Sequence, residues 1–300
     1  MPPRLAATAV FVALLWAGNF VLTQAALDAH MTPLLLVAAR FALASSLVLV
    51  TPRPAGVGWS CLALIGLGLG IGQFGLATLA MQAGLTPGLT SLVLQMQCLA
   101  TLGLGSALLG ERLSPRALGG SVFALVGMAG LVTMGAPSRR GLALASGAAL
   151  VAAALNILIK RVAPLAEPVR LAVWISPFPV LPLLALSCVV ETSPLATIRD
   201  VDPAVLAPAI VYGGLISTVA GTALWTRLLH QAPASSVAPF TLLVPVFGAA
   251  LSALIDGRLP APTAVLPFFA VLAGLAVAQS GSRSPALEIA QPRPGRGLSA

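Results

Sequence analysis

Apolar residues form long runs that cover almost the whole chain, and short polar segments separate one run from the next. The runs are continuous, rich in Leu, Ala and Gly, and close to the roughly 20 residues that a helix needs to cross a bilayer. Barrel strands would alternate apolar and polar positions instead, which leaves helices as the spanning structure. The pattern predicts an all-α, polytopic membrane protein. Its ten transmembrane helices are expected near 5–27, 33–50, 59–82, 87–109, 115–134, 141–160, 169–190, 204–229, 234–255 and 262–280.

Polar caps followed by proline mark several helix starts, because proline lacks the N–H that a first helical residue would leave unpaired. Such pairs stand at Thr32-Pro33, Thr86-Pro87, Ser114-Pro115 and Asp202-Pro203. The connections between runs are short, except for the one that precedes Pro203, so no soluble domain is expected. Residues 282–300 are rich in Pro, Gly and Arg and are predicted to be a disordered cytoplasmic tail.

A weak internal repeat relates residues 86–113 to residues 232–259. Aligned without a gap, the two segments share a proline near the start, Ser-Ala-Leu in the middle and Arg-Leu at the end. The repeat divides the chain into five-helix units at 1–137 and 138–281. An odd number of spans forces the second unit to cross the membrane in the opposite sense, which gives an inverted repeat. This geometry favours a transporter over a static scaffold.

The charge pattern supports the same class of protein. Hydrophobic residues make up 58% of the chain and charged residues 8%, with a mean hydropathy of +1.00 and a net charge of +8. The basic residues are spread over loops, which does not favour a nucleic-acid partner. Eleven of them fall on the side of the N-terminus and four on the other side, so both termini are expected in the cytoplasm.

The acidic residues indicate that no enzymatic or proton-relay centre lies within the membrane. All eight acids are predicted in loops or tails, whereas intramembrane relays commonly use Asp, Glu or His. The runs hold no metalloprotease motif, no carboxylate pair and no Ser/His arrangement. The three cysteines form no CxxC pair. We therefore expect no enzyme, no metal and no cofactor, and the simplest transport mode is passive or exchange.

Two helices carry polar faces that point to a shared cavity. In the first run, Trp16, Asn19 and Thr23 fall on one helical face. Asn156 and Lys160 share a face of the sixth run, which is equivalent to the first in the repeat. Taken alone, Lys160 is more simply interpreted as a cytoplasmic anchor that reaches the lipid headgroups.

Other polar residues at membrane depth have two possible roles. Arg40 either bonds the freed carbonyls of a neighbouring helix or attracts a substrate carboxylate. In the fourth run we expect Gln97 to share a face with Thr90 and Thr101, while Gln95 points elsewhere. Each glutamine is either interhelical glue or a ligand contact. Further candidates are Gln73, Phe74, Thr218, Thr222 and Trp225.

Several motifs resemble the EamA family of the drug/metabolite transporter superfamily. They are LLWAGNFV (14–21), ARF (39–41), GQF (72–74), GLTSLVLQMQ (88–97), GERLSP (110–115) and VAPFTLLVPV (237–246). Within the family the likeness is strongest to bacterial exporters of cysteine and O-acetylserine. The resemblance implies an inner-membrane carrier with a central cavity between its halves that exports small metabolites such as amino acids. GERL marks the fold rather than the cargo, and in the second copy its acid is displaced to Asp256.

The combined reading predicts an exporter of amino acids or their derivatives that works by alternating access. A broad exporter of apolar or cationic drugs is the alternative, and a non-transporting scaffold or channel is the third possibility. The expected partners are a small-molecule substrate and the lipid bilayer, and the sequence leaves the oligomeric state open. The predicted substrate-binding residues are Trp16, Asn19, Arg40, Gln73, Phe74, Gln95, Gln97, Asn156 and Trp225.

Overall fold

The computed structural model describes residues 1–85, 87–129, 138–192, 194–255 and 262–280, and these contain helices and no strands. The first half of the chain comprises α1 (Pro3–Asp28), α2 (Pro33–Ser46), the 3₁₀ turn η1 (Leu47–Leu49), α3 (Trp59–Leu67), the π-helix η2 (Gly68–Gly75), α4 (Leu76–Gln82), α5 (Pro87–Leu94), α6 (Met96–Leu109) and α7 (Pro115–Ala129). The predicted tail lies outside the described residues. The chain folds into the all-α class that its apolar runs predict.

The second half repeats this arrangement of long helices with short irregular segments. It comprises α8 (Arg139–Val162), η3 (Ala163–Leu165), α9 (Pro168–Ile175), α10 (Val180–Val190), α11 (Pro194–Asp200), α12 (Pro203–Val211), the π-helix η4 (Tyr212–Gly221), α13 (Thr222–Gln231), α14 (Ala234–Val237), the 3₁₀ segment η5 (Ala238–Leu242), α15 (Leu243–Ile255) and α16 (Pro262–Ser280). Asp202 caps α12 by accepting the Ala204 N–H at 2.8 Å. Helix α11 fills the connection before Pro203, which the sequence pattern gave no reason to expect as helical.

Within the described ranges, seven helical stretches are long and apolar enough to cross a membrane. They are Pro3–Asp28, Trp59–Gln82, Thr90–Leu109, Arg139–Leu165, Pro168–Val190, Pro203–Gln231 and Ala234–Ile255. Two shorter apolar stretches, Pro33–Leu49 and Phe269–Ala278, also fall within predicted spans. Large apolar side chains such as Phe11, Leu64 and Val126 are exposed on the outside of the bundle. An exposed apolar exterior is what a lipid-facing surface requires.

Equivalent helices of the two halves are irregular at equivalent places. The third helical stretch of each half contains a π-helix, η2 or η4. The fourth stretch of the first half breaks between α5 and α6, and its counterpart in the second half passes through η5, where Pro239 removes a backbone donor. π-helical turns are rare and are frequent at functional sites. The irregular segments therefore mark the part of the bundle where a site is expected.

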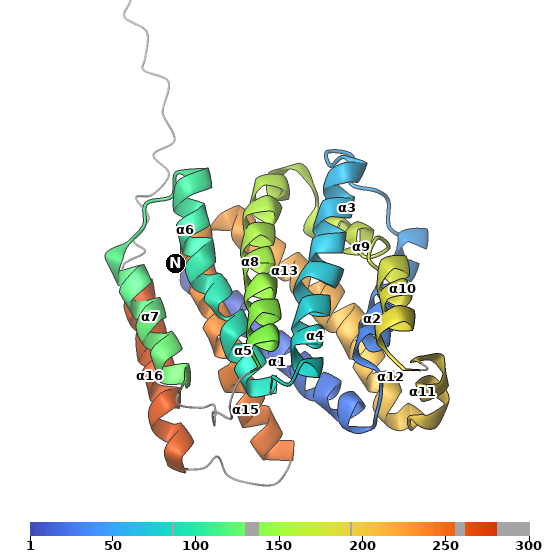
Figure 1. Ribbon diagram of the computed structural model, residues 1–300. Helices are drawn as coiled ribbons and strands as arrows, with labels where there is room; N and C mark the ends of the chain where they lie inside the picture. The colour runs from blue at the N-terminus through green and yellow to red at the C-terminus, as the bar shows by residue number, and fades with distance from the viewer. Residues whose placement is uncertain (86, 130–137, 193, 256–261, 281–300) are drawn as a thin grey trace, which may run out of the picture.

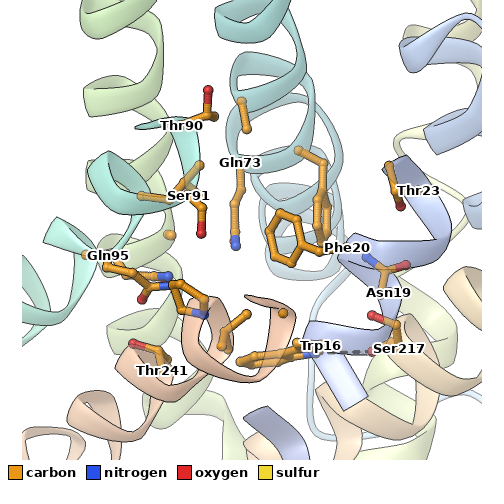
Figure 2. A pocket seen from close by; sticks show the side chains of 18 of the residues that line it. Trp16, Asn19, Phe20, Thr23, Gln73, Thr90, Ser91, Gln95, Ser217 and Thr241 are labelled. Carbon is orange, nitrogen blue, oxygen red and sulfur yellow. Dashed lines mark hydrogen bonds between the residues drawn. The ribbon is translucent and has the colours of Figure 1, made fainter. Parts of the chain in front are cut away.

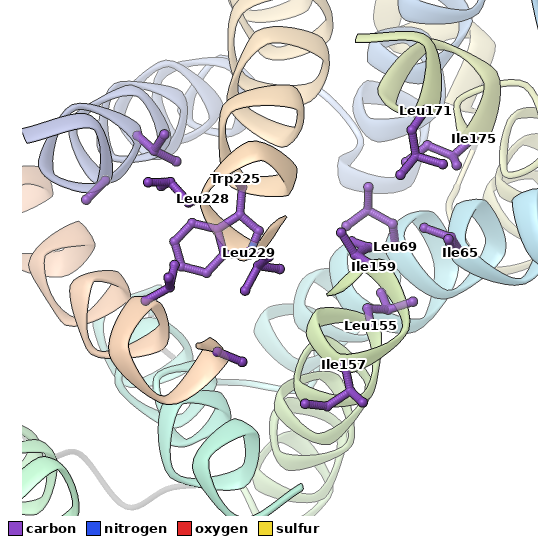
Figure 3. Close-up of a cluster of buried hydrophobic side chains, with 14 of the residues drawn as sticks. Ile65, Leu69, Leu155, Ile157, Ile159, Leu171, Ile175, Trp225, Leu228 and Leu229 are labelled. Atoms are coloured by element: carbon purple, nitrogen blue, oxygen red, sulfur yellow. The ribbon is translucent and has the colours of Figure 1, made fainter. Parts of the chain in front are cut away.

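Small residues set the closest helix contacts. Helices α7 and α16 pack along each other at one side of the bundle (Figure 1), and a Cβ at Gly120 or Gly274 would collide with backbone of the partner helix. Gly66 and Gly70 approach α9 and the start of α10 equally closely, so this glycine-rich stretch allows close helix packing. Gly103 has no neighbour within 4 Å and serves no such purpose. The main apolar core joins α3, α8, α9 and α13 (Figure 3).

Candidate transport cavity

A cavity of about 370 Å³ lies between the two halves of the chain. Its walls come from α1, α2, η2, α4, α5 and α6 of the first half and from α8, η4, α13, η5 and α15 of the second, and Figure 2 shows side chains from opposite walls converging on it. All nine residues predicted to bind substrate line this space. The structure thus brings the predicted residues together, while their contact with a substrate stays a prediction.

Two tryptophans form the inner end of the cavity. The rings of Trp16 and Trp225 lie 5.1 Å apart between centroids at an angle of 52°. The Trp16 indole N–H donates to the carbonyl of Ser217 at 3.3 Å (Figure 2). The Trp225 indole donates to Asn156 Oδ1 at 2.8 Å, and the Asn156 amide donates in turn to Thr101 at 3.2 Å. This network holds the polar faces predicted on the first and sixth spans in fixed positions.

Arg40 is the one charged side chain that the described part of the chain contributes to the cavity lining. Its side chain is almost fully buried, and its guanidinium carbon lies 5.3 Å from the centre of the Phe74 ring. Nη2 lies 3.5 Å from the carbonyl of Gly213 in η4, and Nε has no hydrogen-bond partner. Arg40 therefore makes a long hydrogen bond to a helix carbonyl, as the structural role requires. It also keeps an unpaired N–H donor beside the cavity, as the substrate-binding role requires.

Gln95 lies on the cavity wall beside Gln97, and the prediction that it points elsewhere was wrong. The expectation assumed one continuous helix, but α5 ends at Leu94 and α6 begins at Met96. The intervening turn changes the angular spacing, so that both glutamines line the same space. The side-chain oxygens of Gln95 and Asn19 are buried without a hydrogen-bond partner. Buried polar atoms without partners are costly, so these two oxygens are suited to a ligand.

The cavity has a mouth at one end of the bundle. From η5 into α15 the lining passes from buried Thr241 to exposed Ala249, and on α1 Phe20 is 41% exposed. The C-terminal end of α15 lies at the opposite side of the bundle from the C-terminal ends of α6 and α8 (Figure 1). The lining residues therefore open toward the α15 end, and on the other side they end near the tryptophans and Ile159, the residue before Lys160 on α8.

A polar cluster closes the other end, and we call Glu111, Lys160, Ala232, Ala234 and Ser235 the closed-end cluster. Glu111 accepts the backbone N–H groups of Ala234 and Ser235 at 2.8 and 3.0 Å. Lys160 Nζ lies 3.6 Å from Glu111 Oε1 and donates to the carbonyl of Ala232 at 2.6 Å. It also donates to Leu229 at 2.9 Å. Lys160 thus faces inward, and its interpretation as a headgroup anchor was wrong.

A second acid lies at a helix end and is buried more deeply than Glu111. Glu191 follows α10, and its carboxyl oxygens lie 2.6 and 3.3 Å from the N–H groups of Leu34 and Leu35 in the first turn of α2. Ser187 donates a short hydrogen bond to it, and Gln82 lies 3.5 Å away. Glu191 is only 7% exposed. Glu111 and Glu191 follow helix ends, as predicted, but a position after a helix end is not the same as exposure to water. Asp28 and Asp200 are the last residues of α1 and α11, so the prediction of a loop position was wrong for these two, and Asp256 and Glu288 lie outside the described residues.

Several lining residues were missed by sequence reasoning. They are Phe20, Gln24, Thr78, Ser91, Ser217 and Thr241. Gln24 and Phe20 follow the Trp16 face by whole helical turns, and this spacing could have identified them. Ser217 lies in a π-helix, whose wider turn changes the spacing that a regular α-helix would give. The part of the chain that the structure describes holds no group of three His, Cys, Asp or Glu that could bind a metal.

The chain is similar to known transporters over almost its full length. The model of the EamA-like transporter family matches residues 4–133 and again residues 139–279. A protein of Salmonella typhimurium (strain LT2) named "Probable amino-acid metabolite efflux pump" is 32% identical over 285 residues, covering 92% of this chain and 94% of that protein. A protein of the same name from Escherichia coli (strain K12) is 31% identical over 262 residues, covering 84% of this chain and 87% of that protein.

The fold is shared with solved structures. One, titled "Crystal structure of protein", superposes with a TM-score of 0.75 at 18% identity and covers 94% of this chain and 98% of that chain. Such a likeness concerns the fold alone. The two family matches, the two relatives and the apolar helical bundle around a cavity agree with one another. The chain therefore belongs to the EamA-like transporter family and is a multi-pass membrane transporter rather than an enzyme.

Proposed function

We propose that this protein exports amino acids or their derivatives from a bacterial cytoplasm by alternating access through the cavity. The observation that carries the proposal is the cavity itself, which lies between the halves, carries polar side chains on largely apolar walls and is closed at one end only. Relatives that cover nearly the whole chain are named amino-acid metabolite efflux pumps. Cysteine and O-acetylserine are the first cargoes to test.

The proposed topology is ten spans in two inverted five-helix repeats, with both termini in the cytoplasm of a cell with an inner membrane. The paired π-helices η2 and η4 and the paired interruptions in the fourth stretch of each half support the repeat. On this topology the closed-end cluster faces the cytoplasm and the mouth near Ala249 faces outward, because α1 carries the chain from the N-terminal side to the mouth side. The state is then outward-open.

Counterflow in proteoliposomes tests the export proposal. The purified chain is reconstituted, the vesicles are loaded with an unlabelled amino acid, and entry of the same labelled compound is followed for cysteine, O-acetylserine, leucine and phenylalanine. Saturable uptake that needs internal cargo is the expected result. Uptake that does not saturate would indicate a channel, and absence of uptake with the whole panel would overturn the proposal.

The aromatic walls favour a second candidate, an exporter of apolar or cationic drugs. Trp16, Phe20, Phe74 and Trp225 together give the cavity a large apolar surface. Ethidium is a suitable cationic probe in the same vesicles. Ethidium counterflow without amino-acid counterflow would support this candidate in place of the first.

A further inference from the structure

We propose that the cavity selects its cargo by charge, accepting small molecules with a free carboxylate and rejecting cations that lack one. Arg40 is the residue that binds the carboxylate, and the unpaired oxygens of Asn19 and Gln95 accept hydrogen bonds from the amino group of a zwitterion. This inference rests on the proposed export function, and it assigns the specificity to particular atoms of the cavity.

The first argument is the balance of charge on the cavity wall. Among the described residues, the lining includes one Arg and no Asp, Glu, Lys or His. The two ion pairs found in the described ranges join Lys160 to Glu111 and Arg170 to Glu167, so neither neutralises Arg40. A buried guanidinium without a counterion is unfavourable, and an anionic group that enters beside it removes part of that cost. A cation without a carboxylate adds repulsion in the same low-dielectric space.

The second argument is that Arg40 is held in place by its surroundings. A Cβ at Gly213 would collide with Arg40 Nε and Cδ, and a Cβ at Gly214 would collide with the Arg40 carbonyl, so α2 and η4 meet at the shortest possible separation. Phe74 covers one side of the guanidinium at 5.3 Å. The Gly213 carbonyl is shared, because Thr218 donates to it at 2.7 Å. The guanidinium is therefore fixed at the wall while its donors are incompletely satisfied.

The third argument is the complementary acceptors on other walls. Asn19 Oδ1 on α1 and Gln95 Oε1 at the α5–α6 break are both buried and unpaired. Figure 2 shows Asn19 and Gln95 on opposite sides of the cavity, with Gln73 extending into it between them. A neutral amide oxygen accepts hydrogen bonds from an ammonium group without supplying a full negative charge. The site therefore holds the amino group of a zwitterion but gives a lone cation too little compensation for its lost water.

The test compares one cargo with its capped forms. The four ligands share one side chain. Leucine carries both charges, leucinamide only the cation and N-acetylleucine only the anion, while isoamylamine carries the cation and has no carbonyl group. Binding to the full chain in detergent is followed by tryptophan fluorescence, which reports on Trp16 and Trp225. The background is Trp59→Phe/Trp174→Phe, since these two indoles pack on each other away from the cavity at 5.7 Å.

The expected order is leucine first, N-acetylleucine second, and the two carboxylate-free amines weaker than leucine by about tenfold or more, as for the loss of a charge-assisted hydrogen bond. Arg40→Met should abolish the preference for leucine over leucinamide, and Arg40→Lys should restore part of it. Arg53→Met is the matched control, because Arg53 lies outside the cavity lining and donates to the Val57 carbonyl at 2.9 Å, a contact that the Trp59→Phe background leaves in place. Gln95→Glu should improve isoamylamine binding severalfold.

Two results would overturn the inference. One is equal binding of leucine and leucinamide to the unmodified site. The other is a loss in Arg40→Met that affects all four ligands equally and keeps their order, because a structural arginine would act in that way. Counterflow distinguishes failure of the selectivity proposal from failure of the export proposal. Carboxylate-selective binding without any counterflow would contradict export and support the selectivity. Counterflow of leucine and leucinamide at equal rates would contradict only the selectivity.

Discussion

A glutamate lies near each end of the cavity, and both side chains accept backbone N–H groups at the start of a helix. Glu191 is buried and Glu111 is partly buried. Glu111 follows α6 and accepts N–H groups at the start of α14, whereas Glu191 follows α10 and accepts N–H groups at the start of α2. Each carboxyl group therefore joins the end of a helix in one half to the start of a helix in the other. Acids are favourable there because a helix start carries partial positive charge.

The two glutamates differ in the side chains that contact them. Glu111 is paired with Lys160, which also donates to the carbonyls of Leu229 and Ala232. Glu191 is bound by Ser187 and lies near Gln82, both neutral. Glu111 joins the closed end, where α6, α8, α13 and α14 meet, while Glu191 lies at the side of the mouth, which is already open. This contrast suggests that Glu111 is the contact to break during transport and Glu191 the contact that persists.

Replacing Glu191 by Leu should have the largest effect, and the effect should be on stability. The change leaves the Leu34 and Leu35 N–H groups buried without acceptors, which costs about 3 kcal/mol. Unfolding in detergent, followed by circular dichroism, measures it. Glu167→Leu is the matched control: Glu167 caps α9 through Val169 at 3.2 Å but is exposed, so its loss should cost about 1 kcal/mol or less. Equal losses would show that burial of Glu191 contributes nothing.

Replacing Glu111 by Gln should shift the balance between the two transport states more than the stability. The neutral amide loses the attraction of Lys160 and one of two acceptors, a change of about 2 kcal/mol, or roughly thirtyfold in population. Thiol labelling of Ala232→Cys should rise and that of exposed Ala249→Cys should fall, in a background without Cys61, Cys98 and Cys188. Unchanged labelling at both positions would mean that the cluster does not gate the closed end.

The sequence predicted the helices and the residues of the cavity because both depend on local periodicity. Trp16 and Asn19 stand on a regular helix, and their shared face follows from spacing alone. The predicted direction of the Gln95 side chain was wrong because the break between α5 and α6 changes that spacing. No residue type in that segment predicts a break. The tertiary partners of Lys160 and Glu191 could not be predicted at all. Their contacts join residues 49 to 157 positions apart, and helical periodicity carries no information at that range.

Replacing Lys160 by Met should have the same direction of effect as Glu111→Gln but a smaller size. Glu111 keeps both backbone N–H groups in this variant, so only the ion pair and the two carbonyl contacts are lost. We expect about 1 kcal/mol, or roughly fivefold more labelling of Ala232→Cys. Arg161→Met provides the control on the same helix, because Arg161 donates to the Leu108 carbonyl at an exposed position. If Lys160→Met exceeded Glu111→Gln, the lysine and not the acid would be the main closing contact.

Replacing Gly110 by Ala should have the smallest effect and tests how Glu111 is positioned. Gly110 ends α6 with φ of 66°, a left-handed conformation that turns the chain so that Glu111 folds back beside Gly105. A Cβ in that conformation costs about 1 kcal/mol. Gly103→Ala in the same helix is the control with opposite sign, since Gly103 is helical, exposed and free of neighbours. Alanine there should stabilise the helix slightly.

Because Gly110→Ala strains the turn that carries Glu111, it should also raise labelling of Ala232→Cys, whereas Gly103→Ala should leave it unchanged. A destabilised Gly110→Ala protein with unchanged labelling would separate the helix cap from the closing contact.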